Sequence, residues 1–116
     1  MEIVSVTIGL PVTDLAESID WYRRVLELPE PDLEPAEGVV EWRVGPVWLQ
    51  LMEAEGASTG CSAVLRLGVA DVRARREQLL AAGVDVGAVE HVPGAVDYVD
   101  VTDPDGNTLS LYTELD

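Results

Sequence analysis

The alternation of apolar and polar positions predicts one succession of elements twice along the chain: a strand, a helix and three further strands. In the first half, residues 3–10 alternate with a period of two, which is typical of a half-buried strand. Asp14 and Glu17 form a capping box that opens a helix, and Pro29 and Pro31 end it. The strands expected after this helix are residues 32–36, Val39–Val44 and Val47–Met52, the last two forming a hairpin around Gly45 and Pro46.

The second half repeats this plan. Ser62–Val69 alternates as the first strand does, and Asp71–Ala82 is expected to form a helix that Gly83 ends. Asp103-Pro104-Asp105-Gly106 is a strong turn signal. The other strands expected here are a short one near Val86–Val92 and the pair Val96–Thr102 and Asn107–Thr113 on either side of the turn.

A repeated phrase at the junction of strand and helix indicates that the two halves are related. Leu10–Leu15 (LPVTDL) recurs 57 residues later as Leu67–Val72 (LGVADV), and the last strand of each half recurs with an offset of 60. Glu53–Gly60 is small and polar, so we expect it to link the halves. A duplicated unit usually builds one domain from two similar halves, and the space between halves is a natural ligand site.

Length and composition are those of a single globular domain. The chain has 116 residues, of which 47% are hydrophobic, and no apolar run approaches the roughly 18 residues of a membrane span. No basic region opens the sequence, so no signal peptide is expected. Cys61 is the single cysteine and cannot form an internal disulfide, which favours a reducing cytoplasm as the location.

The net charge disfavours one class of partner. The chain has 22 Asp and Glu residues against seven arginines and no lysine, which gives a net charge of −15. Nucleic acid is not an expected partner, because binding phosphates requires the opposite sign. The acidity either attracts a cationic ligand or serves only solubility.

The duplicated plan resembles a known superfamily once two further motifs are added to it. These are Val12-Thr13-Asp14-Leu15 followed by Trp21-Tyr22, and the late turn Asp103-Pro104-Asp105-Gly106-Asn107. Together they resemble the vicinal oxygen chelate superfamily, which includes glyoxalase I, extradiol dioxygenases, methylmalonyl-CoA epimerase, fosfomycin resistance enzymes and bleomycin resistance proteins. The resemblance covers essentially the whole chain.

The resemblance implies an α+β fold. Two β-α-β-β-β modules, about residues 1–54 and 61–116 of one domain spanning 1–116, would pair into a curled mixed sheet around a cavity, with the helices on the outer face. Related proteins pair two chains and share grooves between subunits, so the resemblance also implies a homodimer.

Strand periodicity then divides each strand into a helix-packed face and a face toward the cavity. The helix-packed face is expected to carry Ile8, Leu10, Leu49, Leu51, Leu65, Leu67, Leu109 and Leu111, preceded by Val4 and Val6. The open face is expected to carry Ser5, Thr7, Gly9, Trp48, Gln50, Met52, Ser62, Val64, Arg66, Thr108, Ser110 and Tyr112. This face is either an ordinary solvated surface or a small-molecule site. The large side chains Trp48, Met52 and Tyr112 favour the ligand site.

Enzymes of this superfamily depend on a divalent metal, and the resemblance places its ligands at Thr7, Gln50, Val64 and Ser110. Only Gln50 is a residue type that the family uses as a ligand. Val64 cannot coordinate a metal, and neutral hydroxyls are poor substitutes for imidazole or carboxylate. Because such a site needs about three protein ligands, we expect no metal and no cofactor.

Charged residues of the open face allow more than one interpretation. Arg66 lies on this face by alternation, and the resemblance adds Asp100 and Tyr98. A buried pair of Asp100 and Arg66 would be either structural, or would orient a polar ligand or act as acid and base.

The remaining candidates carry less chemistry. His91, the single histidine, lacks partners at metal-ligand spacing and is either an edge-strand residue or a general base. Cys61 has no neighbour that would activate its thiol. Trp42 is expected in the core, whereas the faces on which Glu41 and Arg43 lie are not fixed by the pattern.

Three function classes remain open. The first is a metal-free binding protein, similar to the bleomycin resistance branch, that sequesters an antibiotic or metabolite. The second is a superfamily enzyme, metal-free or with relocated ligands: a lyase, isomerase, cyclase or dioxygenase-like protein acting on a small oxygenated substrate. The third is a regulatory or accessory domain. The residues expected to bind the ligand are Thr7, Trp48, Gln50, Met52, Arg66, Tyr98, Asp100, Ser110 and Tyr112.

Overall fold

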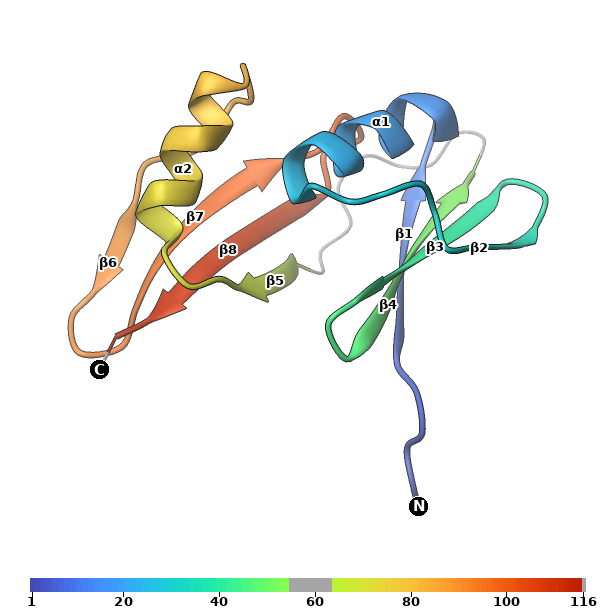
Figure 1. The fold of residues 1–116 in the computed structure, drawn as a ribbon, viewed down its shortest axis with the longest axis horizontal. Coiled ribbons are helices and arrows are strands. Elements are labelled where there is room, and N and C mark those ends of the chain that lie inside the picture. The colour runs from blue at the N-terminus through green and yellow to red at the C-terminus, as the bar shows by residue number, and fades with distance from the viewer. Residues whose placement is uncertain (55–63, 116) are drawn as a thin grey trace. The chain divides into compact units, whose positions relative to one another are not determined.

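The computed structural model describes residues 1–54 and 64–115. The chain divides into two compact units, residues 1–59 and 60–116, which we call the first and second modules. Each module holds one helix and a four-stranded mixed sheet in the order strand, helix, three strands. The predicted α+β fold with two β-α-β-β-β modules is therefore confirmed (Figure 1).

The sheet of the first module has the strand order β1-β4-β3-β2. β1 (Thr7–Val12) pairs in parallel with β4 (Val47–Glu53). β4 pairs antiparallel with β3 (Val39–Val44), which pairs with the edge strand β2 (Leu33–Ala36). The helix α1 (Leu15–Leu26) contacts β4 and covers one face of this sheet.

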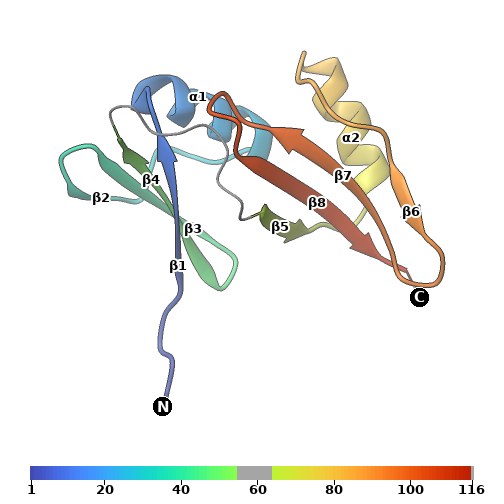
Figure 2. The ribbon, with the colours of Figure 1, turned by 180° about the vertical axis from the view of Figure 1, so that it is seen from behind.

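The second module repeats this topology as β5-β8-β7-β6. β5 (Val64–Gly68) pairs in parallel with β8 (Thr108–Glu114), and β8 pairs antiparallel with β7 (Val96–Thr102). The edge strand β6 (Glu90–Val92) completes the sheet. The helix α2 (Val72–Ala81) contacts β7 and β8, and Figure 2 shows it behind these two strands.

Each helix begins directly after an aspartate that caps it, as predicted for Asp14 and one residue later than predicted for the second helix. The Asp14 carboxylate accepts a hydrogen bond from the Glu17 N–H at 3.1 Å, and the Asp71 carboxylate accepts one from the Ala74 N–H at 3.1 Å. Each bond satisfies a backbone donor that the first helical turn leaves open. The duplicated phrase is thus a duplicated helix start.

The last strand of each module also holds the start of its helix. Glu53 Oε2 accepts from the Leu15 N–H at 3.0 Å, and Thr113 Oγ1 accepts from the Val72 N–H at 2.8 Å. Thr113 in turn donates to the Val69 carbonyl at 2.9 Å. Strand and helix are therefore joined by polar contacts as well as by their apolar faces.

The apolar face of each strand packs as the alternation predicts. The apolar sheet residues buried in the first module are Leu10, Val12, Val40, Trp42, Leu49 and Leu51, and those in the second are Leu65, Val99, Val101, Leu109 and Leu111. The helices add buried Tyr22 and Val25 in α1, and Val72 and Leu79 in α2. Burying one such side chain contributes about 1.5–3 kcal/mol, so packing of the helix on its sheet stabilises each module.

Trp42 is fully buried, as expected, and its indole Nε1 donates to the Pro29 carbonyl at 2.9 Å. This bond satisfies the one polar atom of the side chain. The burial of Trp42 fixes the face of its two neighbours. Glu41 and Arg43 lie on the open face, opposite Gln50 and Trp48.

The first strand starts later than the alternation predicts. β1 begins at Thr7. The pairing with β4 ends at Val6, whose carbonyl accepts from the Trp48 N–H at 2.8 Å. Val4 and Val6 were expected on the core face, but they are 86% and 45% exposed. That prediction was wrong because β4 begins at Val47, so that the pairing ends at Val6 and residues 1–5 have no strand beside them. They extend beyond the sheet, as Figures 1 and 2 show.

The second module differs from the prediction at two strands. β5 begins at Val64, and Cys61, Ser62 and the expected linker residues 55–60 lie outside the described residues. β6 is shorter than expected, since Val86 makes only an isolated bridge to Val101. Neither described helix is long and apolar enough to cross a membrane.

The late turn is closed by its own side chains. Asp103 Oδ1 accepts from the N–H groups of Asp105 at 2.9 Å and Asn107 at 2.8 Å, and Asn107 Nδ2 donates to Asp103 Oδ2 at 2.9 Å. All three residues are buried. This motif therefore serves the fold, because it fixes the hairpin that aligns β7 with β8.

Candidate functional site

The open face of the second sheet carries a row of three polar residues. Arg66, Ser110 and Asp100 lie opposite one another on β5, β8 and β7. Arg66 Nη1 donates to Ser110 Oγ at 3.2 Å. Ser110 is fully buried although it lies on the open face. In our interpretation it holds the arginine rather than contacting a ligand itself.

Asp100 does not pair with Arg66. Both side chains are exposed, and within residues 1–54 and 64–115 the structure shows no ion pair between Arg66 and a carboxylate. The buried pair considered from the sequence is therefore not formed. Asp100 lies beyond Ser110, two strands away from Arg66, which corresponds to roughly 10 Å.

Two tyrosines form the neighbouring row. Tyr98 on β7 lies opposite Tyr112 on β8, and Tyr112 lies opposite Gly68 on β5. A Cβ atom at Gly68 would come within 3.2 Å of the Tyr112 ring and hydroxyl, so glycine leaves room for this ring. The Arg66 guanidinium carbon lies 6.0 Å from the Tyr98 ring centroid, within cation–π range.

These side chains line a pocket that lies entirely within the second module. Its volume is about 610 Å³, and it is open to solvent. The lining residues are Arg66, Ala95, Val96, Tyr98, Tyr112, Glu114 and Leu115. Ligand pockets typically have volumes of about 300–1,000 Å³ and combine apolar walls with a few polar groups. Three of the residues predicted from the sequence, Arg66, Tyr98 and Tyr112, meet here.

The predicted residues of the first module lie on the open face of the other sheet. The Arg43 guanidinium lies 5.6 Å from the centroid of the Trp48 ring. Gln50 Nε2 donates to Glu41 Oε2 at 2.6 Å. The exposed Thr7 is the register partner of Trp48 on β1.

Gly9 gives this first face its shape. A Cβ atom at Gly9 would come within 3.0 Å of Gln50 Oε1 and 3.1 Å of Met52 Cε. The two side chains therefore lie over the backbone of β1. The predicted lining residue Ser62 lies outside the described residues, and Ser5 lies before the start of β1.

The residues at the positions of the family's metal ligands do not fit a divalent cation. Val64 has no donor atom, and Gln50 offers only its amide oxygen, because its Nε2 donates to Glu41. The Ser110 hydroxyl accepts from Arg66, whose positive charge would repel a metal ion there. Among the described residues, no three His, Cys, Asp or Glu side chains are grouped to hold a metal.

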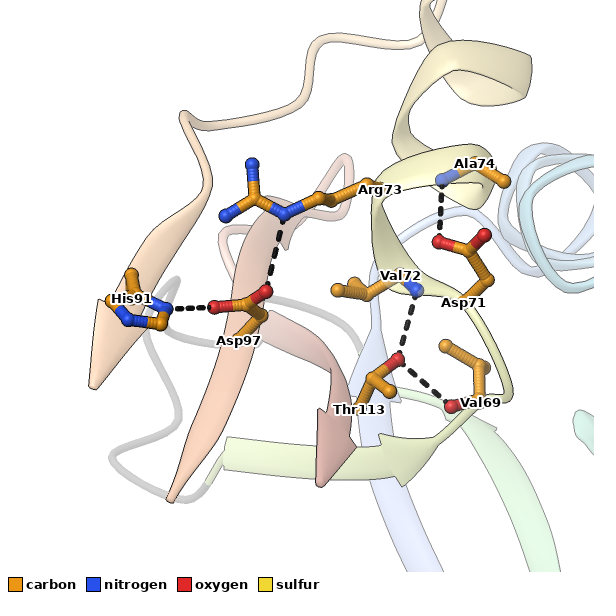
Figure 3. A network of polar contacts seen from close by, with 8 residues as sticks. All are labelled: Val69, Asp71, Val72, Arg73, Ala74, His91, Asp97 and Thr113. Carbon is orange, nitrogen blue, oxygen red and sulfur yellow. Dashed lines mark hydrogen bonds and ion pairs between the residues drawn. The ribbon is translucent and has the colours of Figure 1, made fainter. Parts of the chain in front are cut away.

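A polar network on the helix side of the second sheet was not predicted. Asp97 on β7 is buried, and Figure 3 shows it between His91 of β6 and Arg73 of α2. His91 Nδ1 lies 2.5 Å from Asp97 Oδ1, and Arg73 Nε donates to Oδ2 at 3.1 Å. His91 is thus an edge-strand residue, one of the two interpretations left open.

Sequence alone held one signal for this network. Asp97 occupies a position where the alternation of β7 calls for an apolar residue, and a buried carboxylate needs partners. The hydrogen bond from His91 lowers the pKa of Asp97 below the ordinary value of 3.8, and Arg73 adds to this effect against the opposing effect of burial. The network joins the edge strand and the helix to the strand that carries Tyr98.

Comparison with known proteins extends these observations. A model of the Glyoxalase/Bleomycin resistance protein/Dioxygenase superfamily matches residues 4–111. A glyoxalase/bleomycin resistance protein from Catenulispora acidiphila DSM 44928 has a similar solved structure. It is 25% identical, with a TM-score of 0.79 over 96% of this chain and 98% of that one. By sequence, no curated protein matches the chain.

Two further solved structures share the fold at lower identity. TnmS3, an antibiotic binding protein from Streptomyces sp. CB03234, is 23% identical, with a TM-score of 0.82 over 99% of both chains. The fosfomycin resistance protein FosX from Listeria monocytogenes, complexed with Mn(II) and sulfate, is 15% identical. Its TM-score is 0.78 over 99% of this chain and 92% of that one. One fold therefore supports both a binding protein and a metal-containing resistance protein.

Proposed function

The chain belongs to the glyoxalase/bleomycin resistance protein/dioxygenase superfamily, and we propose that it binds a small molecule, an antibiotic or a metabolite, without a metal ion. The observation that carries this proposal is the pocket lined by Arg66, Tyr98 and Tyr112. It has the volume of a ligand pocket and combines a cation with two aromatic rings. The antibiotic-binding function of TnmS3 supports a binding role for a chain of this fold.

The other residues predicted to bind the ligand lie beside the pocket or on the first sheet. Asp100 lies beside the pocket on β7, and Ser110 holds Arg66. Thr7, Trp48, Gln50 and Met52 offer a second surface for ligand contact on the first sheet. The family match includes both modules, which supports one functional domain.

Metal analysis and ligand screening together test this function. Protein purified without added metal should carry no stoichiometric Zn, Ni, Fe or Mn, and EDTA should leave its melting temperature unchanged. A thermal-shift screen of cationic glycopeptides, polycyclic aromatics and oxo-acids should find compounds that raise the melting temperature. Each bound compound should be recovered chemically unchanged. A tightly held metal coordinated by Gln50, or conversion of the compound, would favour the enzyme alternative.

We also propose that the protein is a homodimer. Each four-stranded sheet has two edge strands, β1 and β2 in the first module and β5 and β6 in the second. Edge strands carry unpaired backbone groups that a second chain can cover. Sedimentation should show a dimer at about tens of micromolar, well above ordinary dimer dissociation constants. A monomer under these conditions would contradict this assembly without affecting the fold.

A further inference from the structure

The donor groups of Arg66 narrow the class of ligand, and this step rests on the binding function proposed above. Arg66 makes one hydrogen bond, to Ser110, and no ion pair within the described part of the chain. A guanidinium keeps its charge throughout the physiological pH range and carries several N–H donors. Its other donors are therefore available to an acceptor in the pocket.

The residues around Arg66 indicate the chemistry of the remaining part of the ligand. Tyr98 and Tyr112 lie opposite each other in the next row of the sheet, and both line the pocket with Arg66. Aromatic rings favour flat partners, which they contact by offset stacking or edge to face. A charge-assisted bond from a guanidinium favours a planar anionic group such as a carboxylate. We propose that the pocket binds a flat aromatic compound that carries one ionised oxygen acid, with the acid on Arg66.

The net charge of −15 does not oppose this assignment. Exposed charges separated by more than a Debye length, about 8 Å at physiological ionic strength, are largely screened. Arg66 acts at contact distance, where a hydrogen bond adds to the charge attraction. The cationic ligand that the net charge alone would favour is therefore not the one that the pocket selects.

Glu114 limits the ligand at the other end of the pocket. It lies on β8 four residues beyond Ser110, which corresponds to roughly 14 Å along the strand. Its carboxylate disfavours a second acid at that distance. The preferred ligand therefore has its one anionic group at the Arg66 end and a neutral or positively charged group toward Glu114.

Three compounds with the same ring system test this class: naphthoate, naphthamide and naphthylmethylamine, which are anionic, neutral and cationic. Calorimetric titration of the full chain should show naphthoate binding at least about tenfold more tightly than the amide, and the amine binding most weakly. Arg66→Gln should remove this preference, so that naphthoate and naphthamide bind within about threefold of each other. Arg66→Lys, which keeps the charge without the planar fork, should retain part of it.

Arg24→Gln is the matched control. Arg24 is exposed on α1, so its replacement makes the same change in net charge outside the pocket. It should leave the preference for naphthoate unchanged. Because Arg66 is also exposed, we expect Arg66→Gln to fold, and its circular dichroism and melting temperature check this.

The outcomes separate the ligand class from the binding function. Binding of the amine or the amide as tightly as naphthoate, with all three weakened by Tyr98→Leu, would overturn the anionic class and leave the pocket in place. A preference for naphthoate that survives Arg66→Gln would also overturn it. Binding of none of the three compounds would overturn this inference, whereas the proposed binding function would fall only if the wider thermal-shift screen also found no ligand.

Discussion

The two modules share one backbone plan, yet their open faces differ in chemistry. Across β1, β4 and β3 the central row reads Gly9, Gln50 and Glu41, and across β5, β8 and β7 it reads Arg66, Ser110 and Asp100. The next row reads Pro11, Met52 and Val39 in the first module, and Gly68, Tyr112 and Tyr98 in the second. The cation–aromatic pair of the first module, Arg43 and Trp48, lies in the row on the other side of Gln50, whereas the second module has Arg66 in the central row beside two tyrosines.

The difference between the open faces indicates which residues of the duplicated unit determine the fold. The helix-packed faces are alike, since buried Leu49 and Leu51 correspond to buried Leu109 and Leu111. Open-face residues do not contribute to that packing, so they can differ without changing the backbone. The ligand chemistry is therefore set by positions that the fold leaves free.

The helix sides of the two sheets differ at several positions, and one of these carries a charge in the second module. Asp97 lies opposite Thr113 in the second module. The corresponding position in the first module is Gly38, whose carbonyl accepts from the Glu53 N–H at 2.8 Å. The charged network of Asp97, His91 and Arg73 thus belongs to the second module alone.

The largest expected change in stability comes from comparing substitutions on the two faces of the first module. Trp42→Ala should lower the free energy of unfolding by about 3–5 kcal/mol, because Trp42 is fully buried and the variant leaves a cavity. Trp48→Ala on the open face should lower it by less than about 1 kcal/mol. Urea denaturation measures both values. A loss of several kcal/mol in Trp48→Ala would place Trp48 in the core and contradict the assignment of the open face.

A smaller loss of stability tests whether the two helix starts are equivalent. Asp14→Ala and Asp71→Ala each remove one N-cap bond, so each should cost about 1 kcal/mol. Thermal and urea denaturation should give similar losses for the two variants. Asp20→Ala, exposed within α1, has no cap to lose and serves as the control. Unequal losses would show that the duplicated phrase has different energetic roles in the two modules.

The smallest expected effect depends on pH and belongs to the second module. Asp97 has a pKa below its ordinary value of 3.8, first because of the hydrogen bond from His91 and then because of Arg73. A lowered carboxyl pKa stabilises the folded chain above the unfolded value, and this contribution is lost as pH falls through the folded value. Asp97→Asn should therefore be less stable than the native chain at neutral pH, and the difference should shrink below about pH 4.

Asp100→Asn controls for this measurement, because it removes the same charge from the open face of the same strand. Its destabilisation at neutral pH should be smaller than that of Asp97→Asn, as followed by urea denaturation across the pH range. A difference between native chain and Asp97→Asn that stays constant into acid would show that the charge of Asp97 does not stabilise the module.

Sequence patterns predicted the parts of the fold that local chemistry controls. Asp14 and Asp71 mark helix starts because the capping bond is formed within one turn. The alternation in β4 and β8 assigned Leu49 and Leu109 to the core because adjacent side chains in a strand point to opposite faces. The same alternation failed for Val4, because a strand ends where its partner ends and the partner is distant in sequence.

The candidate site was predictable as a face but not as a set of contacts. Periodicity placed Arg66 and Tyr112 on one side of the sheet, and the register then brought Tyr98 beside Tyr112. The hydrogen bond from Arg66 to the buried Ser110 depends on the rotamer of Arg66, which no pattern encodes. Asp97 and its two partners come from three separate elements, so their meeting depends on tertiary packing.

The parallel pairing of the first and last strands also orders the folding of the chain. Thr7 pairs with Trp48 and Val64 with Thr108, so neither sheet is complete until the last strand of its module is present. Loop closure across a whole module is slow compared with forming the local hairpins β3–β4 and β7–β8. During synthesis all strands of the first module emerge from the ribosome before any strand of the second module emerges. The duplication therefore lets two short units fold one after the other during synthesis, rather than one long unit at its end.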